Sequence, residues 1–255
     1  MFSHLLSTLP DGKTIQVNIG SHWTAVVVEI DGAQRCGLAS SLSNVHKRHG
    51  EPDVPQAGQL ERLSGLELAA LAQSEQPVLA SVGVAAINAL IPPQPDAWVD
   101  LNAEEVIAEH GEGKLVALIG HFPFIPRLRT RVGELVVLEQ HPQPGDLHAD
   151  TALAVIPKAE VVAITGTALI NHTLEDLLAL CSPQAHVILL RASTPLSPVL
   201  FDYEIDLLCG SVVTAIEPVL RTVRQGGIFP QIHHAGVRLV CMKHPAYFHI
   251  GEKSV

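Results

Sequence analysis

The sequence is short of positive charge. It has 16 lysines and arginines against 26 aspartates and glutamates, which gives its 255 residues a formal net charge of −10. Nucleic acids are bound by clustered lysine and arginine, so this balance excludes a nucleic-acid-binding protein. The basic runs are Lys47-Arg48 and three alternating arginines, Arg127, Arg129 and Arg131. Isolated runs of this kind are typical of a solvated surface.

Paired cysteines are missing as well. Cys36, Cys181, Cys209 and Cys241 lie far apart and form no CxxC motif, which excludes a zinc knuckle and a thioredoxin-type redox site. We expect most of them to be small, buried, free thiols. A reducing cytoplasm suits such thiols, and it is the location that we predict.

Long hydrophobic segments are also absent. Residues 1–10 have neither the basic start nor the apolar core of a signal peptide. The longest uncharged stretch is centred on residues 78–91, and Pro77 and Pro92 bracket this apolar segment. The segment is shorter than the roughly 20 residues that span a bilayer. We therefore expect no membrane partner and interpret this stretch as a buried helix.

What is present, 47% hydrophobic residues, is enough for a full core in one or two domains. The first part opens with two runs rich in β-branched residues, at 14–19 and 24–30, and a third candidate strand follows at 35–42. Residues 20–22 and Asp31-Gly32 suit the two tight turns between them, so the pattern predicts an antiparallel meander.

Two helices are expected after the meander. Ser64 can cap a helix that runs through Ala72, with Glu67 in the third helical position of a capping box. The alanine-rich segment 81–90 suits a second helix in close packing. Strands followed by helices predict an α+β domain, residues 1–110, with the helices on one face of the sheet.

From residue 111 the pattern changes to apolar strands that alternate with helices. Residues 92–112, with a short helix at 104–108, form the link between the two parts. Uninterrupted apolar strands predict a mainly parallel sheet covered on both faces, which is a doubly wound, Rossmann-like α/β domain over residues 111–255. The expected strands are 115–119, 134–138, 161–164, 187–190, 206–213 and 237–242, with helices at 173–180 and 217–225.

In an open parallel sheet, ligands bind beyond the carboxyl ends of the strands. Glu139 ends the second strand about 20 residues after Gly120, where Rossmann domains place an acid for the ribose of a nucleotide. A surface acid at a strand end is the alternative. The loop at Gly120 lacks the other glycines of a dinucleotide fingerprint and carries bulky Phe122 and Phe124. It therefore favours a nucleoside-like or pterin-like ligand over a nicotinamide dinucleotide.

The segment Thr165-Gly166-Thr167 follows the third strand and is better suited to hold a polar group. A glycine lets the backbone approach a ligand closely, and the two hydroxyls donate or accept hydrogen bonds. Asn171 or Thr173 begins the next helix, where its role is either ligand contact or helix capping. The sequence leaves both roles open.

The sequence has 14 histidines but no HExxH motif, GxSxG elbow or Walker loop. The histidines that lie close together are His46 and His49, His141 and His148, and His233 and His234. We expect them to be loop and surface residues, with a metal site assembled from separate loops as the alternative. His121, just after the first strand of the second part, is placed to act as an acid or a base near neutral pH.

Seven segments have an order and a spacing that are specific as a set. They read GLA at 37–39, SVGVAAINAL at 81–90, IGHFP at 119–123, ITGTALINHT at 164–173, STPL at 193–196, LFDY at 200–203 and CGS at 209–211. On these segments, which extend over most of the chain, the protein resembles the heavy-metal chelation family, once known only as a domain of unknown function.

The resemblance implies an N-terminal domain like that of enolases, followed by a Rossmann-like domain with partial likeness to methyltransferases. It also implies a site between the two domains, with a role in heavy-metal chelation or in making or cleaving pterin-, flavin- or siderophore-like molecules. Glu139 and His121 would be the catalytic groups. The ligand-binding residues would be Gly120, Phe122, Thr165, Gly166, Thr167, Asn171, Ser193, Thr194 and Pro195, with Ser40 and Asn88 facing the cleft from the first domain.

Two positions depart from the pattern of the family. Arg191-Ala192 stands where the resemblance leads us to expect Gly-Pro, and Glu204 stands where we expect glycine. Arg191 either adds a cation for a carboxylate or phosphate or narrows the pocket. A ligand known for the family would therefore not transfer directly to this chain.

Three functions are compatible with these residues. They are an enzyme that condenses or hydrolyses a small chelating or heterocyclic molecule, a non-catalytic binder of a metal or metal chelate, and a methyltransferase-like binder of a nucleoside cofactor. We rank the enzyme first because chemistry is commonly placed in a cleft between domains. The cofactor stays open between a transition metal and a nucleoside-like ligand, and a homodimer is the default assembly.

Overall fold

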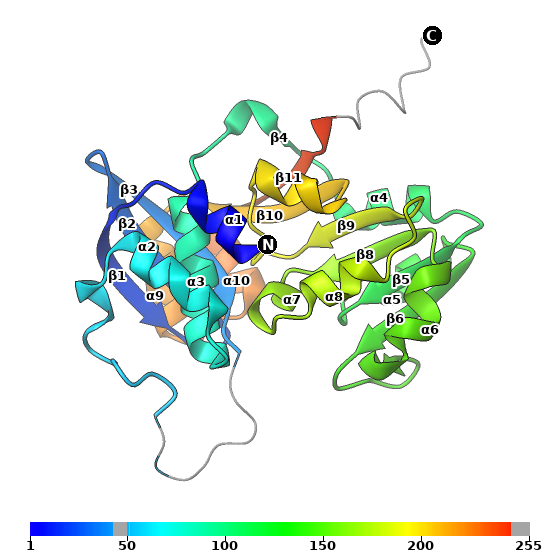
Figure 1. Cartoon of the computed structure of the whole chain (residues 1–255), viewed down its shortest axis with the longest axis horizontal. Coiled ribbons are helices and arrows are strands. Elements are labelled where there is room, and N and C mark those ends of the chain that lie inside the picture. The colour runs from blue at the N-terminus through cyan, green and yellow to red at the C-terminus, as the bar shows by residue number, and fades with distance from the viewer. Residues whose placement is uncertain (43–49, 51, 246–255) are drawn as a thin grey trace.

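The computed structural model describes residues 1–42, 50 and 52–245, which build one sheet of three strands and one of eight (Figure 1). The helices are α1 (Phe2–Ser7), α2 (Gly65–Ala70), α3 (Pro77–Leu90), α4 (Ala103–His110), α5 (Ile125–Leu128), α6 (Ala152–Val155), α7 (Thr167–Ile170), α8 (Leu174–Ala179), α9 (Ile216–Arg224) and α10 (Phe229–Gly236). The strands are β1 (Lys13–Ile19), β2 (Trp23–Ile30), β3 (Ala33–Ser40), β4 (Trp98–Val99), β5 (Leu115–Ile119), β6 (Glu134–Glu139), β7 (Leu147–His148), β8 (Val161–Thr165), β9 (His186–Leu190), β10 (Leu207–Val213) and β11 (Val237–Lys243). None of the helices described is both long and apolar enough to cross a membrane.

The three-stranded sheet is the antiparallel meander that the sequence predicts. β2 pairs with β1 on one side and with β3 on the other. Asp31 and Gly32 turn the chain between β2 and β3 with φ angles of 52° and 78°, the left-handed conformation that such a hairpin turn requires. The predicted capping box begins α2, where the Ser64 hydroxyl and the Glu67 carboxylate each accept a hydrogen bond from the other residue's N–H.

Helices from both parts of the chain cover this small sheet. α3 lies against β2 and β3, and α2 packs on α3. On the opposite face, α9 and α10 form an apolar cluster with the strands, made of Trp23, Ala25, Val27 and Leu38 from the sheet and Val219, Leu220, Val223 and Ile232 from the helices. A shared core therefore joins the first 110 residues to the rest, and the boundary near residue 110 stays a prediction.

The eight-stranded sheet has the order β4-β11-β10-β9-β8-β5-β6-β7 and is parallel from β10 to β7. The predicted α/β architecture is confirmed. Both faces are buried, because Val116 and Leu118 of β5 pack against α4 and α5 while Ala117 belongs to the core on the other face. This double burial explains why the parallel strands read as continuous apolar runs.

Two features of the large sheet differ from the expectation. β11 runs antiparallel to β10, because the pair α9 and α10 returns the chain to the same end of the sheet instead of crossing it. Sequence reasoning missed α10, and with it the change of direction. β4, within the expected link, is a strand of only two residues that pairs with β11, and so short a strand has no pattern of its own.

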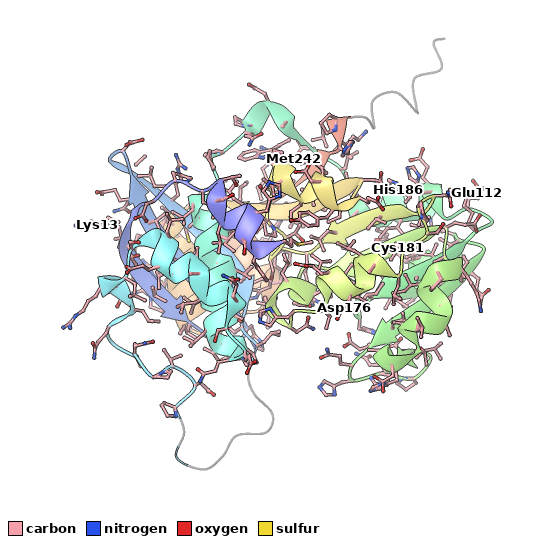
Figure 2. The ribbon with its side chains drawn as sticks, in the orientation of Figure 1. Lys13, Glu112, Asp176, Cys181, His186 and Met242 are labelled. Carbon is pink, nitrogen blue, oxygen red and sulfur yellow. A yellow bond between two sulfur atoms is a disulfide. The ribbon has the colours of Figure 1, made fainter. Side chains whose placement is uncertain are left out.

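The prediction of free thiols is wrong for Cys209 and Cys241. They lie opposite each other in β10 and β11 and form a disulfide. Their pairing depends on the register of two strands that are 32 residues apart, which no local pattern shows. Cys36 and Cys181, the latter labelled in Figure 2, are free. Burial raises the pKa of Cys36 to about 12 and that of Cys181 to about 11, so both stay protonated at neutral pH.

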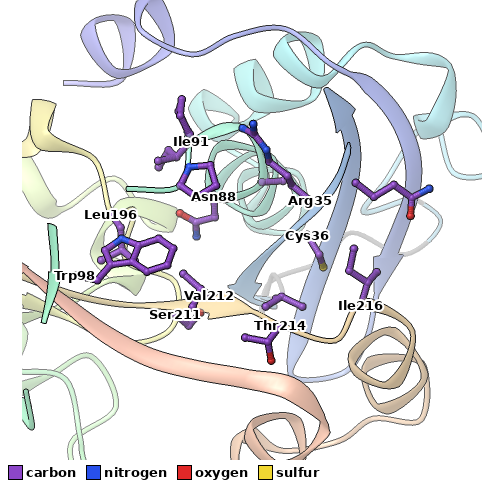
Figure 3. A pocket seen from close by; sticks show the side chains of 15 residues that line it. Arg35, Cys36, Asn88, Ile91, Trp98, Leu196, Ser211, Val212, Thr214 and Ile216 are labelled. Carbon is purple, nitrogen blue, oxygen red and sulfur yellow. The ribbon is translucent and has the colours of Figure 1, made fainter. Parts of the chain in front are cut away.

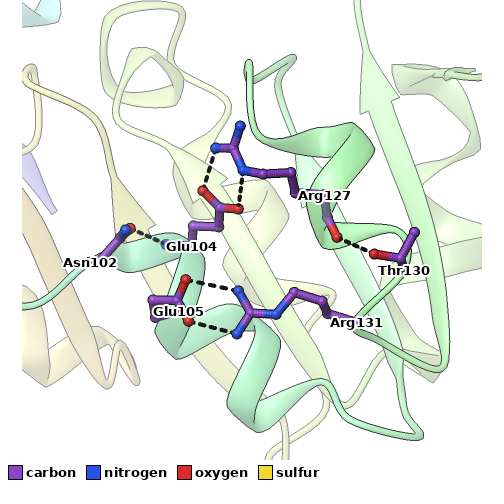
Figure 4. Close-up of polar contacts among 6 residues, drawn as sticks. All are labelled: Asn102, Glu104, Glu105, Arg127, Thr130 and Arg131. Carbon is purple, nitrogen blue, oxygen red and sulfur yellow. Dashed lines mark hydrogen bonds and ion pairs between the residues drawn. The ribbon is translucent and has the colours of Figure 1, made fainter.

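The alternating arginines are exposed but paired. Arg127 donates two hydrogen bonds to the Glu104 carboxylate, at 2.8 and 2.6 Å, and Arg131 pairs in the same way with Glu105 (Figure 4). Arg129 donates to the backbone carbonyl of Leu135. The run therefore ties α5 and the residues after it to α4 and β6.

The two arginine pairs should differ in what they contribute to stability. The Glu104 side chain is 9% exposed, whereas that of Glu105 is 56% exposed. Arg127→Met would leave a buried carboxylate without its partner, while Arg131→Met would remove a pair that solvent screens. We expect the first change to lower the melting temperature at least twice as much as the second. Circular-dichroism melts of both variants test this, and equal losses would contradict it.

Candidate functional site

The order of the parallel strands reverses beside β5. The chain passes from β5 to β6 on one side and then crosses to β8 on the other side. In open α/β sheets, ligands bind outside the carboxyl ends of the strands at such a reversal. Gly120 follows β5 and Thr165 ends β8, so the two loops at the reversal are among those that the sequence singled out.

A cavity of about 960 Å³ lies at this edge, and we call it the main cavity. Its walls come from the strand ends of the large sheet, from the small sheet and from the segment that begins α10. Among its lining residues are six of the predicted ligand-binding and catalytic residues: Ser40, Gly120, Glu139, Thr165, Thr167 and Asn171. Its volume is within the range, roughly 300–1,000 Å³, of cavities that enclose small organic ligands.

The Glu139 carboxylate is held in place by backbone groups. Its Oε2 accepts a hydrogen bond from the His121 N–H at 2.9 Å, and its Oε1 accepts one from the Gln140 N–H at 2.8 Å. The imidazole of His121 is engaged elsewhere, because its Nδ1 lies 2.9 Å from Oδ2 of the buried Asp146 carboxylate. His121 thus contacts Glu139 through its backbone, and it is Glu139 that faces the main cavity.

The threonine segment contributes two hydroxyls to the main cavity. Oγ1 of Thr165 and Oγ1 of Thr167 are hydrogen-bonded at 3.0 Å, and both residues line the wall. Gly166 faces the other way, since a Cβ there would lie 2.7 Å from the Thr194 hydroxyl and 2.9 Å from the Thr194 backbone nitrogen. Gly166 and Thr194 therefore allow two loops to pack closely together, and they do not line the main cavity.

Asn171 combines the two roles that the sequence left open. Its Oδ1 accepts hydrogen bonds from the N–H and the hydroxyl of Thr173, just before α8. The same residue lines the main cavity, where its Nδ2 amide has no partner among the described residues. The amide is thus available to a ligand while the carbonyl orders the start of α8.

Two predicted residues, Ser193 and Asn88, join the sheets behind the main cavity. The fully buried Ser193 hydroxyl accepts a hydrogen bond from the Ser40 N–H at 2.9 Å and lies 3.1 Å from the Ser40 hydroxyl. Nδ2 of Asn88 donates to the carbonyls of Ser193, at 3.1 Å, and of Leu38, at 2.8 Å. These bonds fix the small sheet to the loop after β9. Pro195 is buried in the same loop.

Arg191 also lines the main cavity, although the sequence marked it only as a departure from the family. It follows β9 with a φ angle of 115°. Its guanidinium carbon lies 5.3 Å from the centroid of the Phe122 ring, and Phe122 itself is buried and stacked on Phe124. Arg191 is exposed to solvent at this wall. Partial desolvation of its guanidinium lowers its pKa, and the charge of Glu139 opposes this shift. Because an arginine normally titrates above pH 12, Arg191 remains a cation at neutral pH.

Other lining residues carry no signal in the sequence. Trp23 of the small sheet and Phe229 of α10 pack against each other with ring centroids 5.5 Å apart. Asp176 of α8, labelled in Figure 2, also lies on the wall. Only the folded arrangement brings these residues to the ends of β5 and β8, so no local pattern could identify them.

The histidines do not assemble a metal site in the part of the chain that the structure describes. No group of three or more His, Cys, Asp or Glu residues is placed to hold a metal ion there. His141 and His148 line the main cavity, but Nδ1 of His148 is engaged with the Asp150 carboxylate at 3.1 Å. His233 and His234 lie on α10. His46 and His49 are outside the described residues.

Comparison with known proteins shows to which family the chain belongs. Two family models, each described as "Putative heavy-metal chelation", match residues 2–91 and 102–242. A curated but uncharacterized protein of Methanocaldococcus jannaschii is 27% identical over 175 residues, and the match spans 66% of each chain, just under two thirds of that relative's length.

Solved structures agree with the family models. One solved structure is that of a protein of unknown function from Desulfitobacterium hafniense, which belongs to the family matched by residues 102–242. Its TM-score to this chain is 0.81 at 25% sequence identity, and the match covers 95% of this chain and 97% of that one. One of the same family from Pyrococcus horikoshii has a TM-score of 0.78 at 19% identity, over 95% and 99%, and shows the fold alone. Since one family model spans more than half of the sequence, the chain belongs to the heavy-metal chelation family.

Proposed function

We propose that the main cavity binds a small organic anion of the chelator type, free or as its metal complex, and that Arg191 is the principal anchor for its negative charge. The observation that carries this proposal is that Arg191 lines a cavity of about 960 Å³. A guanidinium binds a carboxylate or phosphate through two parallel hydrogen bonds. The stacking of Arg191 on Phe122 holds the group in place for such a contact.

The rest of the wall suits a molecule with a flat, partly apolar body. Trp23 and Phe229 supply aromatic surface, and Thr165, Thr167 and Asn171 supply hydrogen-bonding groups. An apolar wall with a few polar groups is typical of small-molecule sites. Within the pterin-, flavin- and siderophore-like classes suggested by the family resemblance, pterin carboxylates, flavin phosphates and catechol carboxylates have this combination of ring and anion.

A heavy metal would bind in this site as part of a complex with the organic molecule. The described residues offer no set of side chains that fits a bare ion, so the metal's ligands would come from the bound organic molecule. The role in chelation is then recognition of a chelator or of its complex. This proposal is compatible with the description of the two family models, "Putative heavy-metal chelation", and with the side chains present.

For the chemical step we assign Glu139 as the group that moves a proton during condensation or hydrolysis. Each of its oxygens accepts one backbone N–H, and a carboxylate oxygen has a second lone pair free for a ligand or a water molecule. His121 acts as a positioning residue, because its backbone N–H orients Glu139 while Asp146 holds its ring. The homodimer stays a prediction.

A thermal-shift screen tests the binding proposal. The probes are pterin-6-carboxylate, flavin mononucleotide, 2,3-dihydroxybenzoate with and without Fe³⁺, S-adenosylmethionine, and metal salts alone. We expect organic anions to raise the melting temperature, since a ligand of the folded state stabilises it. Arg191→Met should abolish the shift caused by pterin-6-carboxylate and by flavin mononucleotide, and Arg221→Met, which changes an exposed arginine of α9 that does not line the cavity, should retain it.

Two results would argue against an anion site anchored by Arg191. If metal salts alone shift the melting temperature and a chelator reverses the effect, the protein binds the ion itself. If S-adenosylmethionine alone binds, and Glu139→Ala removes that binding, the cavity holds a nucleoside cofactor. An unchanged affinity of Arg191→Met for the organic anions would exclude the anchor directly.

A further inference from the structure

A second cavity, of about 290 Å³, lies where β3 meets β10, and we call it the small cavity. It is bounded by β3, the C-terminal end of α3, β4 and β10 (Figure 3). None of its lining residues lines the main cavity. Gln34 and Thr214 are exposed at its margin, so a small molecule can reach it from solvent.

Two buried polar atoms on this wall lack hydrogen-bond partners among the described residues. Nδ2 of Asn88 donates to the carbonyls of Leu38 and Ser193, which fixes the orientation of the amide and leaves its Oδ1 buried and unpaired. Nη1 of Arg35 is also buried and unpaired. Unpaired buried polar groups are rare in folded proteins because each loses its hydration without compensation. Arg35 and Asn88, which carry these two atoms, both line the small cavity and bring a cation and an amide to its wall.

The rest of the wall is largely apolar. Trp98 and Leu196 lie on one side and Cys36 on the other, with Asn88 between them (Figure 3). Because burial raises the pKa of Cys36 to about 12, its thiol is neutral at neutral pH and adds no charge to the site. Arg35 is thus the charged residue that lines the small cavity, so its positive charge favours an anionic ligand.

We infer that the small cavity is a second ligand site, for a small carboxylic acid with a flat apolar body and an N–H or O–H donor, of the hydroxybenzoate or aminobenzoate class. The carboxylate pairs with Arg35, the donor satisfies Oδ1 of Asn88, and the ring lies against Trp98. A cavity of about 290 Å³ accommodates one substituted six-membered ring but not a fused heterocycle with a long side chain. This inference is independent of what the main cavity binds.

The chain offers a direct way to tell the two sites apart, because Trp23 and Trp98 are its only tryptophans. Trp23 lines the main cavity and Trp98 lines the small one. In a Trp23→Phe variant, Trp98 is the only tryptophan, and its emission can be excited separately from that of the two tyrosines. We expect 4-hydroxybenzoate to change its emission saturably, and we expect no change in a Trp98→Phe variant, where Trp23 reports on the main cavity.

Charge recognition is tested by calorimetric titration of the unmodified protein and of Arg35→Met. The variant should bind 4-hydroxybenzoate at least tenfold more weakly, as expected for one hydrogen bond to a charged group. Arg62→Met, which changes an exposed arginine outside both cavities, should bind like the unmodified protein. 4-Hydroxybenzamide, which lacks the charge, should bind the unmodified protein more weakly than the acid by a similar factor, a comparison that needs no variant.

The inference fails if no saturable signal is obtained at millimolar probe, because the unpaired atoms then meet only water. It also fails if the acid and the amide bind equally, or if the emission change comes from Trp23. Asn88 is left unchanged in these tests, since its amide also joins Leu38 to Ser193.

Discussion

Replacing Arg191 by glycine should make the protein more stable and at the same time remove its binding of organic anions. At a φ angle of 115° a side chain crowds its own backbone, and residues other than glycine rarely adopt this conformation. Glycine adopts it freely. The relief of strain outweighs the extra flexibility that glycine gives the unfolded chain, so we expect a net gain of about 1 kcal/mol.

The loss of binding has a separate cause, which a second variant isolates. Arg191→Ala removes the guanidinium but retains a Cβ in the strained conformation, so it should lose binding without gaining stability. Urea denaturation gives the stability of each variant, and titration with the best anion of the screen gives the affinity. Equal stabilities of Arg191→Gly and Arg191→Ala would show that the backbone at this position is not strained.

Glu204→Gly is the matched control for the stability effect. Glu204 also has a positive φ, 58°, at the end of the short helix Pro198–Tyr203, and it does not line the main cavity. Its replacement should raise stability and leave anion binding unchanged. A strained residue retained on a cavity wall is typical of a functional site, and the comparison separates that case from a strained residue elsewhere.

The positions of Arg191 and Glu204 also show what a sequence can reveal. The family resemblance leads to an expectation of glycine at both, and both have positive φ angles in the structure. Conformations that depend on a few consecutive residues leave a local signal. The same is true of the Asp31-Gly32 turn and of the capping box at Ser64, which the sequence predicted correctly.

Features that depend on residues far apart in the chain gave no such signal. The disulfide between Cys209 and Cys241 requires the register of β10 and β11, and the contact between Trp23 and Phe229 requires α10 to lie on the small sheet. The direction of β11 depends on a helix that sequence reasoning missed. None of these can be read from periodicity, because each is set by how separate elements pack.

The sequence predicted those residues of the candidate site that lie at the ends of neighbouring parallel strands. Glu139, Thr165 and Thr167 meet on one wall because the carboxyl ends of parallel strands share an edge. Ser193 and Thr194 follow β9 at the same edge, yet they contact other protein groups. A position at a strand end predicts proximity to a site but not the direction of the side chain.

The packing of α3 leads to the prediction with the largest effect on stability, the change Gly83→Ala. A Cβ at Gly83 would lie 1.8 Å from the backbone nitrogen of Ala72 and 2.4 Å from its Cα. These are backbone atoms of the short helix Leu71–Gln73, so no side-chain rotation can make room. Although alanine favours a helix by about 1 kcal/mol over glycine, we expect a net loss of about 3 kcal/mol in the free energy of unfolding.

Gly65→Ala is the appropriate control, since the added Cβ would meet chiefly the Cδ2 of Leu90, the far end of a flexible side chain, at 2.8 Å. Urea denaturation should show a loss of less than about 1 kcal/mol there. Because α3 also carries Asn88, a shift of this helix in Gly83→Ala should weaken the contact with Ser193 that joins the two sheets. Equal losses in the two variants would mean that α3 can move away from Leu71–Gln73 at little cost, and that the close approach at Gly83 does not hold the helix in place.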